Sequence, residues 1–328
     1  MKTRNFGDAD TQVSEVGLGC WQLGGLCWGD LDEQSAFEIM RVSVDGGVDF
    51  FDTADVYGEG RSETLIGKFL EECSEDIFVA TKIGRFPRPG WPDNFSKETL
   101  TQHTEGSLGR LGVDALDLVQ LHCIPTEVMQ QGDVFDTLRE LKQAGKIKRF
   151  GTSVESMDEA LMCLEQEGLS SLQIIFNIYR QKPIVELFDK AKEKGVGIIA
   201  RVPLASGLLT GKLSMDTSFP ENDHRKFNKD GECFNVGETF AGLPYAKGVE
   251  LSEELTSYVP DGISMTQMSL RWILDHDAVS VVIPGASRPD QATANAAISD
   301  LAPLPEELHK RIAEFYETAV KDHIRGPY

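Results

Sequence analysis

The stretch VDFFDTADVYG, residues 48–58, is a short apolar run that stops at an acid, Asp52, and reaches a phenol, Tyr57, shortly afterwards. Three further apolar runs stop in the same way: IFVATK at Lys82, LDLVQLH at His122 and KRFGTS at a serine. Continuous apolar runs of this length, separated by helical patterns, are typical of buried parallel strands. Such strands direct their carboxyl ends to one face, where these folds place their chemistry. The runs therefore predict that an acid, a phenol, an amine and an imidazole meet at this face.

The same alternation of strand and helix patterns extends through most of the chain. Residues 2–16 contain two short extended stretches around a Gly-Asp turn, which predict an N-terminal β-hairpin. Amphipathic segments that end in glycine predict helices between the later strands. Eight strands are expected, at residues 16–20, 48–53, 77–82, 116–122, 147–153, 172–177, 197–202 and 279–284. This order predicts an α/β protein with a (β/α)8 TIM barrel, a single domain over residues 1–328, and not a two-domain Rossmann enzyme.

One long segment interrupts the alternation, between the seventh and eighth expected strands. It contains the polar stretch SMDTSFPENDHRKFNKDGECFNVGETF before a helical pattern resumes at residues 248–258. A long insertion on the side that carries the chemistry is usually functional or mobile. A lid formed by residues 212–247 is the preferred interpretation, and a decorative loop is the alternative.

The composition narrows the function classes. The net charge is −21 at pH 7, which argues against nucleic acid or an anionic membrane surface as a partner. Solvated surface is the simplest interpretation of the excess acid, with adaptation to high salt as the alternative. No apolar run reaches membrane-spanning length and no secretory signal is visible, so a cytoplasmic location is expected. Six scattered cysteines are typical of reduced thiols, and the scattered histidines predict no metal site. The sequence does not indicate whether the protein forms oligomers.

Each candidate residue also has a simpler explanation. A lysine that closes a buried run needs an anionic partner, and Asp52 supplies one, so Lys82 and Asp52 form either a structural ion pair or part of an active site. A Schiff base on Lys82, as in a TIM-barrel isomerase or aldolase, is another alternative. Considered alone, His122 is as often a hydrogen-bonded histidine of the core as a functional residue. The glycines of VGLGCWQLGG, residues 16–25, do not form GxGxxG, so they are a weak dinucleotide fingerprint.

Longer phrases carry a resemblance to a known family. GLGCWQLGG, FFDTADVYG, ETLIGKFL, VATKIG, LDLVQLH, IKRFGTS, PLASGLLTGK and VIPGASRPDQ resemble the aldo-keto reductases, in this order and over nearly the whole chain. The form RVPLASGLLTGK is most similar to the bacterial branch of inositol-associated and stress-response reductases. The resemblance implies a (β/α)8 barrel, a nicotinamide cofactor bound without a Rossmann domain, and NAD(P)H-dependent reduction of aldehydes or ketones to alcohols.

The resemblance implies a catalytic tetrad of Asp52, Tyr57, Lys82 and His122. Tyr57 is then the acid that protonates the carbonyl oxygen. Lys82, held by Asp52, favours the phenolate and lowers the pKa of Tyr57. His122 orients the carbonyl by a hydrogen bond. The alternative function is a nicotinamide-sensing regulatory barrel with little turnover, similar to channel-associated β subunits.

The resemblance also implies a cofactor site. Ser153 and Gln173 match residues that hold the carboxamide, Arg201 stands where many members stack an aromatic ring on the nicotinamide, and the loop at residues 207–212 matches the one over the pyrophosphate. A planar guanidinium also stacks, so this departure is compatible with binding. The implied contacts are Gly19, Cys20, Trp21, Asp52, Ser153, Gln173, Arg201, Pro203, Leu204, Gly207, Leu208, Lys212, Gly285, Ser287, Arg288, Gln291 and Asn295.

The segment for the 2′-phosphate departs from the family pattern. Gly285 replaces a lysine and Gln291 replaces an arginine of the familiar NADPH-binding form. Ser287 and Arg288, with the N-terminus of the helix after Pro289, remain suited to a phosphate. NADPH is therefore the expected cofactor, with NADH as the alternative.

Substrate contacts are implied at four positions: Trp21, Trp28, Tyr57 and His122. Ordinary packing is the alternative for either tryptophan. Cys123, directly after His122, replaces a larger or more polar residue that is common there. The expected partner is a small carbonyl compound whose identity the sequence does not give.

Overall fold

Parallel strands form a closed barrel in the computed structural model, which describes residues 1–25, 28 and 31–328. Within these residues eight strands make one sheet in the order β10-β9-β8-β7-β6-β5-β4-β3. Gly17 N donates to Val282 O and Gly19 N donates to Pro284 O, which joins the first strand region to the last and confirms the (β/α)8 barrel. The strands are β3 (Leu18–Gly19), β4 (Phe50–Asp52), β5 (Phe78–Ile83), β6 (Leu118–His122), β7 (Phe150–Ser153), β8 (Leu169–Ile175), β9 (Gly197–Arg201) and β10 (Val279–Val282).

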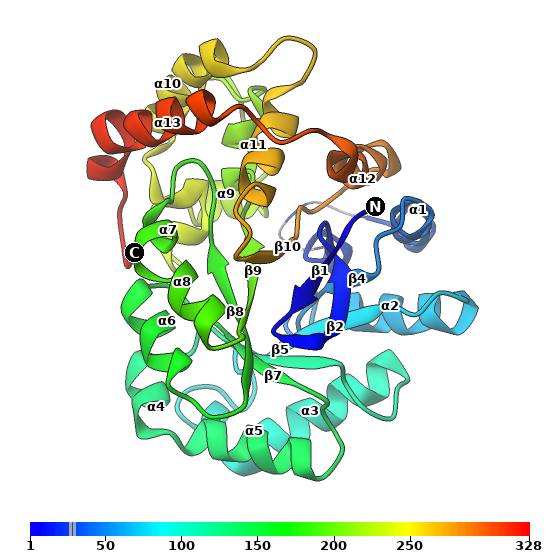
Figure 1. Ribbon diagram of the computed structural model, residues 1–328. Coiled ribbons are helices and arrows are strands. Elements are labelled where there is room, and N and C mark those ends of the chain that lie inside the picture. Colours follow the sequence, from blue (N-terminus) through cyan, green and yellow to red (C-terminus); the bar gives the residue numbers. More distant parts are fainter. Residues whose placement is uncertain (26–27, 29–30) are drawn as a thin grey trace.

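Helices surround the barrel (Figure 1). They are amphipathic: α5 buries Val134, Phe135, Leu138 and Leu141 along one face. The helix α3 ends at Gly112, as the glycine after the expected helix indicated. The backbone of Gly112 is left-handed, and the Gly112 N–H donates to Leu108 O. The helices are α1 (Glu33–Asp45), α2 (Arg61–Glu72), α3 (Lys97–Leu111), α4 (Thr126–Gln131), α5 (Asp133–Gln143), α6 (Met157–Leu164), α7 (Lys182–Glu186), α8 (Phe188–Glu193), α9 (His224–Phe227), α10 (Tyr245–Leu255), α11 (Met265–Leu274), α12 (Pro289–Ala296) and α13 (Glu306–Phe315).

The expected strands all occur, but some of their ends shift. The strand expected at 172–177 is β8, Leu169–Ile175, because Leu169 and Ser171 already pair with β7. It stops before Asn177, whose side chain donates to Val202 O at 2.9 Å and turns the chain. β3 is shorter than the expected 16–20, and only an isolated bridge joins Val16 to β10.

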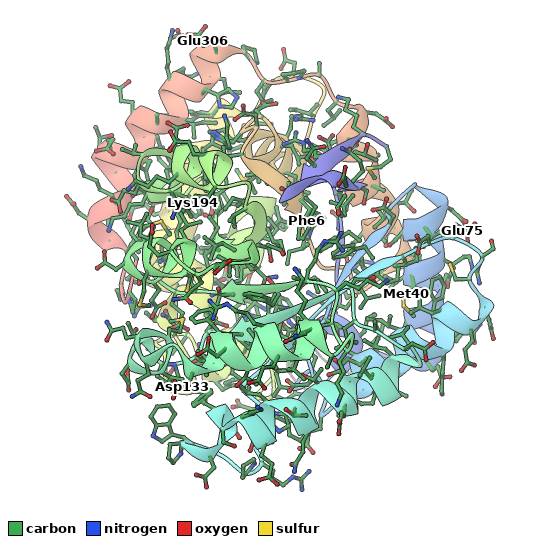
Figure 2. All side chains as sticks on the ribbon, turned by 60° about the horizontal axis from the view of Figure 1, so that its bottom comes forward. Phe6, Met40, Glu75, Asp133, Lys194 and Glu306 are labelled. Atoms are coloured by element: carbon green, nitrogen blue, oxygen red, sulfur yellow. The ribbon has the colours of Figure 1, made fainter. Side chains whose placement is uncertain are left out.

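The predicted hairpin closes the N-terminal end of the barrel. Its strands, β1 (Thr3–Phe6) and β2 (Asp8–Ser14), pair antiparallel. The ring of Phe6 lies 5.5 Å from that of Phe50 and 5.2 Å from that of Phe78, and Phe6 is fully buried. Figure 2 shows Phe6 near the centre of the molecule. An apolar side chain of the hairpin therefore fills the floor of the barrel.

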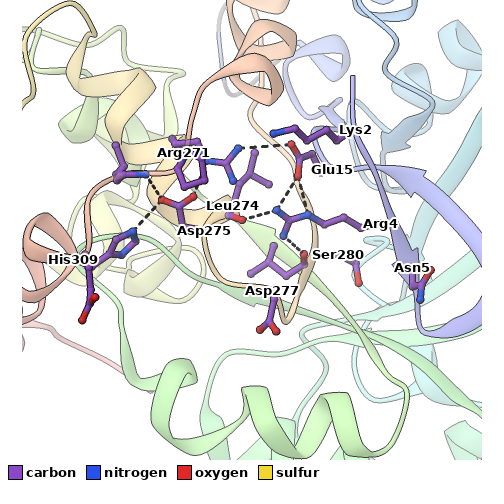
Figure 3. A pocket seen from close by; sticks show the side chains of 14 residues that line it. Lys2, Arg4, Asn5, Glu15, Arg271, Leu274, Asp275, Asp277, Ser280 and His309 are labelled. Carbon is purple, nitrogen blue, oxygen red and sulfur yellow. Dashed lines mark hydrogen bonds and ion pairs between the residues drawn. The ribbon is translucent and has the colours of Figure 1, made fainter.

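A charged network fastens this hairpin to α11. Arg4 Nε donates to Glu15 Oε2 at 2.8 Å, and the same guanidinium donates to the carbonyls of Leu274 and Val279. Glu15 lies between Arg4 and Arg271 (Figure 3). These side chains line a cavity of about 740 Å³ at the N-terminal end of the barrel. These ion pairs link the hairpin to α11, so their evident effect is structural, although Arg271 Nη1 makes no hydrogen bond within the described residues.

The segment between β9 and β10 has more regular structure than its polar sequence indicated. The turn η3 (Ala205–Thr210), α9 and the turn η4 (Val236–Glu238) precede α10, which starts at Tyr245 and not at residue 248. The helix α11 was not expected from the sequence. Its capping box was the available signal, since Ser264 Oγ accepts from Gln267 N while Gln267 Oε1 accepts from Ser264 N. None of the helices in the described part of the chain is long and apolar enough to cross a membrane.

Replacing Phe6 by alanine should lower the free energy of unfolding by about 3–5 kcal/mol, because it leaves a cavity between Phe50 and Phe78. Urea unfolding followed by circular dichroism measures the change. Gln12→Ala on the exposed face of β2 is the matched control and should change stability by less than about 0.5 kcal/mol. Equal effects of the two substitutions would contradict the assignment of Phe6 to the barrel floor.

Candidate active site

A buried ion pair lies at the carboxyl ends of β4 and β5. Lys82 is 1% exposed, and its Nζ donates to Asp52 Oδ1 at 2.6 Å and to Thr53 O at 2.8 Å. It also lies 3.4 Å from the Tyr57 hydroxyl. Three of the four predicted catalytic side chains are therefore in direct contact.

Asp52 is held from the opposite side as well. Its Oδ2 accepts from Gln173 Nε2 of β8 at 2.6 Å and lies 3.5 Å from Gln120 Nε2 of β6. Burial lowers the pKa of Lys82, but Asp52 and Tyr57 outweigh it and the net shift is upward. A Schiff-base lysine needs a lowered pKa, so this environment disfavours the isomerase or aldolase alternative.

Tyr57 belongs to the loop that links β4 to α2. Its ring stacks on Trp21 at a centroid distance of 5.9 Å, and its N–H donates to Ala54 O. Burial raises the pKa of Tyr57, while the positive charge of Lys82 lowers it by a smaller amount. Only the contribution of Lys82 was expected from the sequence. The net result is a phenol that keeps its proton at neutral pH and can donate it.

His122 ends β6 beside the phenol. Its ring centroid lies 5.8 Å from that of Tyr57, with the rings nearly perpendicular. Burial, followed by the charges of Arg85, Lys82 and Arg201, holds the pKa of His122 well below its usual value. The imidazole is thus neutral, and its Nδ1 has no hydrogen-bond partner among the described residues. A neutral imidazole can donate one hydrogen bond to a carbonyl oxygen.

The residues expected to hold the nicotinamide lie on adjacent strands. Ser153 of β7 and Gln173 of β8 are register partners, with Ser153 Oγ 3.4 Å from Gln173 Oε1. Arg201, at the end of β9, donates from Nη2 to Val154 O at 3.2 Å, and its Nε has no hydrogen-bond partner in the described structure. These donors and acceptors, with His122 nearby, fit an aromatic carboxamide.

The turn expected over the pyrophosphate follows β9. Ala205, Ser206 and Gly207 have φ values of 47°, 54° and 104°, so this backbone lies in the left-handed region that favours glycine. The N–H groups of Ala205 and Gly207 donate to Val202 O and Leu204 O within this turn, so these two groups are not free for an anion. The Leu208 side chain is buried in the core and its carbonyl accepts from Ser252 Oγ and Gly211 N, whereas Lys212 is exposed.

The segment expected to bind the 2′-phosphate runs from the end of β10 into α12. Gln291 Oε1 accepts from Ser287 N at 2.8 Å, and Asn295 Nδ2 donates to Gly285 O at 3.3 Å. Arg288 is exposed and paired with its neighbour Asp290, Nε to Oδ1 at 3.1 Å. The predicted residues of this segment therefore lie together.

Cys20 has a different environment from the other predicted cofactor residues. It is fully buried, and its N–H donates to Asp52 O. Its carbonyl accepts from Ser62 Oγ, and its thiol donates to Leu18 O. Since these groups all bond within the protein, the role that the structure shows for Cys20 is to hold the backbone of Asp52 in place.

The segment between β9 and β10 packs against the mouth. Trp21 and Trp28 meet edge to face at 5.7 Å, and the ring of His224 lies 4.8 Å and 4.5 Å from them. Phe234 approaches Trp21 at 6.2 Å. Both tryptophans thus share one aromatic wall with the segment that was expected to form a lid.

Three charged residues at the carboxyl end of the barrel were not predicted from the sequence: Arg85, Glu155 and Glu238. Arg85 Nη2 contacts Glu238 Oε1 at 2.9 Å and Glu155 Oε1 at 3.0 Å. Burial disfavours the charge on Glu238, but Arg85 and Arg201 lower the pKa of this carboxyl to about 2. Arg85 and Glu155 follow strand ends closely, which was a usable signal. Glu238 lies in the long segment, where no pattern marked it.

The carboxylates of Glu155 and Glu238 come close to the thiol of Cys123, with ligand atoms within 4.8 Å of one another. Arginine side chains pair with both carboxylates, at the distances given above. The donor set is therefore that of an ion-pair network. A cation would have to displace these guanidinium groups to bind.

The fold and the site together define a class of protein. A closed (β/α)8 barrel carries a phenol, an imidazole and a lysine–carboxylate pair at the carboxyl ends of its strands, which is an acid–base centre. The model of the Aldo/keto reductase family matches residues 15–317. The chain belongs to this family.

Individual relatives agree with this assignment. The chain is 28% identical to the aldo-keto reductase YhdN of Bacillus subtilis (100% of this chain, 97% of the relative) and 30% identical to the uncharacterized oxidoreductase YqkF of the same species (95% of each). Among solved structures it is similar to the holo form of the aldo-keto reductase AKR11C1 from Bacillus halodurans, with a TM-score of 0.78, 30% identity and coverage of 99% of this chain and 100% of that one. It is also similar to the glycerol dehydrogenase AKR11B4 from Gluconobacter oxydans, with a TM-score of 0.81, 27% identity and coverage of 99% and 98%.

Asp55, between the acid and the phenol of the tetrad, has an unusual environment. It is fully buried, and neither carboxylate oxygen has a hydrogen-bond partner in the described residues. His103 Nδ1 lies 3.9 Å from Oδ2. Burial, and then the charge of Glu63, raise the pKa of Asp55 to about 8, against smaller opposing effects of Arg110 and Lys82.

This pKa makes stability depend on pH. Between about pH 4 and pH 8 the folded chain binds a proton at Asp55 that the unfolded chain has released, so stability falls as the pH rises. Asp55→Asn should therefore stabilise the protein more at pH 9 than at pH 5, by about 1–3 kcal/mol. Urea unfolding at the two pH values measures this, with exposed Asp114→Asn as control. A gain independent of pH would refute the protonated carboxyl.

Proposed function

We propose that this protein is an NADPH-dependent reductase that converts an aldehyde or ketone to an alcohol. The observation that carries the proposal is the placement of Lys82 Nζ within hydrogen-bonding reach of both Asp52 and the Tyr57 hydroxyl. Family membership supports nicotinamide-dependent carbonyl reduction, and the holo form of AKR11C1 is consistent with a bound cofactor.

The chain supplies the proton chemistry of this reaction. The nicotinamide, when bound, provides the hydride, and negative charge then grows on the carbonyl oxygen. Tyr57 donates its hydroxyl proton to that oxygen, and Lys82 stabilises the phenolate that remains. Neutral His122 holds the oxygen by a hydrogen bond and orients the carbonyl. Asp52 keeps Lys82 charged and in place.

The cofactor assignment follows the same geometry. Ser153 and Gln173 would hold the carboxamide, and Arg201 would lie against the nicotinamide ring. Residues 203–212 would follow the pyrophosphate, and Ser287 and Arg288 would face the 2′-phosphate. NADPH is the proposed cofactor because a guanidinium stands at that end, and NADH is the alternative because Asp290 already neutralises it.

The proposal extends to the setting of the protein. We place it in the cytoplasm, in line with the free thiols of Cys20, Cys73, Cys123, Cys163 and Cys233. Its partner would be a small carbonyl compound, and the whole barrel, residues 1–328, would act as one unit. A nicotinamide-sensing barrel remains the rival function and differs in consuming about one equivalent of cofactor.

Tyr57→Phe should reduce carbonyl reduction by about 10²–10⁴-fold, because it removes the proton donor and keeps the ring on Trp21. NADPH consumption with an excess of 4-nitrobenzaldehyde measures the rate, and fluorescence titration should show unchanged NADPH binding.

Tyr258→Phe, on a ring that packs against Phe315 outside the barrel, is the matched control and should leave the rate unchanged. Full activity of Tyr57→Phe would remove Tyr57 from its proposed role. Consumption of only about one equivalent by the wild type would favour the sensor.

Arg288→Ala should weaken NADPH binding by about tenfold or more while changing NADH binding less than twofold, because only NADPH carries the 2′-phosphate that the guanidinium would bind. Parallel fluorescence titrations measure both affinities. Asp290→Asn is the complementary variant, since it frees Arg288 and should strengthen NADPH binding alone. Equal losses for both cofactors in Arg288→Ala would show that this residue does not read the phosphate.

A further inference from the structure

An alternating set of charges spans the mouth beside the tetrad. Arg85 follows β5, Arg201 ends β9 and Glu155 follows β7, whereas Glu238 comes from the segment between β9 and β10. Glu238 binds Arg85 through both carboxylate oxygens, Oε1 to Nη2 at 2.9 Å and Oε2 to Nη1 at 3.3 Å. Its Oε2 also lies 3.7 Å from Arg201 Nη1. One carboxylate therefore pairs with two guanidinium groups.

These charges act on the catalytic groups. Arg85 and Arg201 both lower the pKa of His122, and Glu238 raises that of Tyr57. Arg201 also donates to the thiol of Cys123, the residue after His122, at 3.4 Å. The network thus borders the place where a carbonyl held by Tyr57 and His122 would project the rest of its structure.

A buried guanidinium, that of Arg201, and a half-buried one, that of Arg85, next to a substrate site would normally favour anions. Arginine binds carboxylates through a fixed fork of donors, often in pairs of parallel hydrogen bonds. Here that fork is already filled, since Glu238 occupies two donors of Arg85 and is itself buried. An incoming carboxylate would have to displace a carboxylate of the protein from the same donors.

We propose that Glu238 determines substrate specificity by making the mouth selective for uncharged aldehydes and ketones. It fills the guanidinium of Arg85, which an anionic substrate would otherwise bind, and it lies beside Arg201. This rests on the proposed function, because it concerns the substrate of the same site. Glu155 does not replace it, because it contacts Arg85 through a single hydrogen bond at 3.0 Å.

The proposal can be tested by binding alone, with benzoate and benzamide as probes of nearly equal shape and different charge. Isothermal titration of the protein loaded with NADP⁺ gives both affinities. The wild type should bind benzoate no more tightly than benzamide. Glu238→Gln keeps the side-chain volume and should bind benzoate at least tenfold more tightly, with benzamide changed less than twofold.

Two further variants separate specificity from a loss of packing. Glu232→Gln, on the same segment but exposed, should leave both affinities unchanged. Adding Arg85→Met to Glu238→Gln should abolish the gain for benzoate, because the freed guanidinium is then absent. A wild type that prefers benzoate, or a gain that survives the loss of Arg85, would overturn the proposal.

Turnover distinguishes this inference from the function on which it rests. Rates with 4-nitrobenzaldehyde and 4-carboxybenzaldehyde should show the same shift toward the anion in Glu238→Gln. If no variant reduces either aldehyde but the binding pattern holds, the reductase assignment fails and the selectivity of the mouth stands. If reduction proceeds but Glu238→Gln leaves the preference between the two aldehydes unchanged, the selectivity assignment fails alone.

Discussion

The ion pair of Lys82 with Asp52 is the interaction on which the site depends. An ammonium and a carboxylate out of contact with water are tolerated only when their remaining hydrogen-bonding capacity is met. β4 and β5 supply the pair, and β8 supplies Gln173 to the second carboxylate oxygen. The pair therefore requires strands from different parts of the barrel in one register, and the closed sheet provides that register.

The two ends of the barrel differ in how their polar groups are bonded. At the N-terminal end the hairpin inserts an apolar ring, and its charged groups are consumed by one another and by the end of α11. At the carboxyl end the buried polar groups keep free capacity, as the unpartnered Nδ1 of His122 shows within the described structure. The unpartnered nitrogen beside the phenol supports the proposal that a ligand binds at this end.

The sequence was informative wherever position along a strand determines position in space. Asp52, Lys82 and His122 close apolar runs, and because parallel strands end on one face, their convergence followed from a local pattern. The shift of β8 arose because pairing with β7 begins before the apolar run that marked the strand. Glu238 was beyond such reasoning, since its contacts with Arg85 depend on how a long segment folds back over the barrel, which no local periodicity encodes.

The charge at the carboxyl end of the barrel is set by ion pairs between arginine and glutamate side chains. Arg85 and Arg201 are balanced by Glu238 and Glu155, His122 is neutral, and Tyr57 keeps its proton. In a buried site the forces between charges are stronger than in water, so an unbalanced charge elsewhere would perturb the reacting oxygen. With the surroundings balanced, the charge that the proposed hydride transfer would place on that oxygen would meet Lys82, Tyr57 and His122 as its nearest polarising groups. Preorganised donors of this kind stabilise a transition state most effectively when no competing charge has to reorganise.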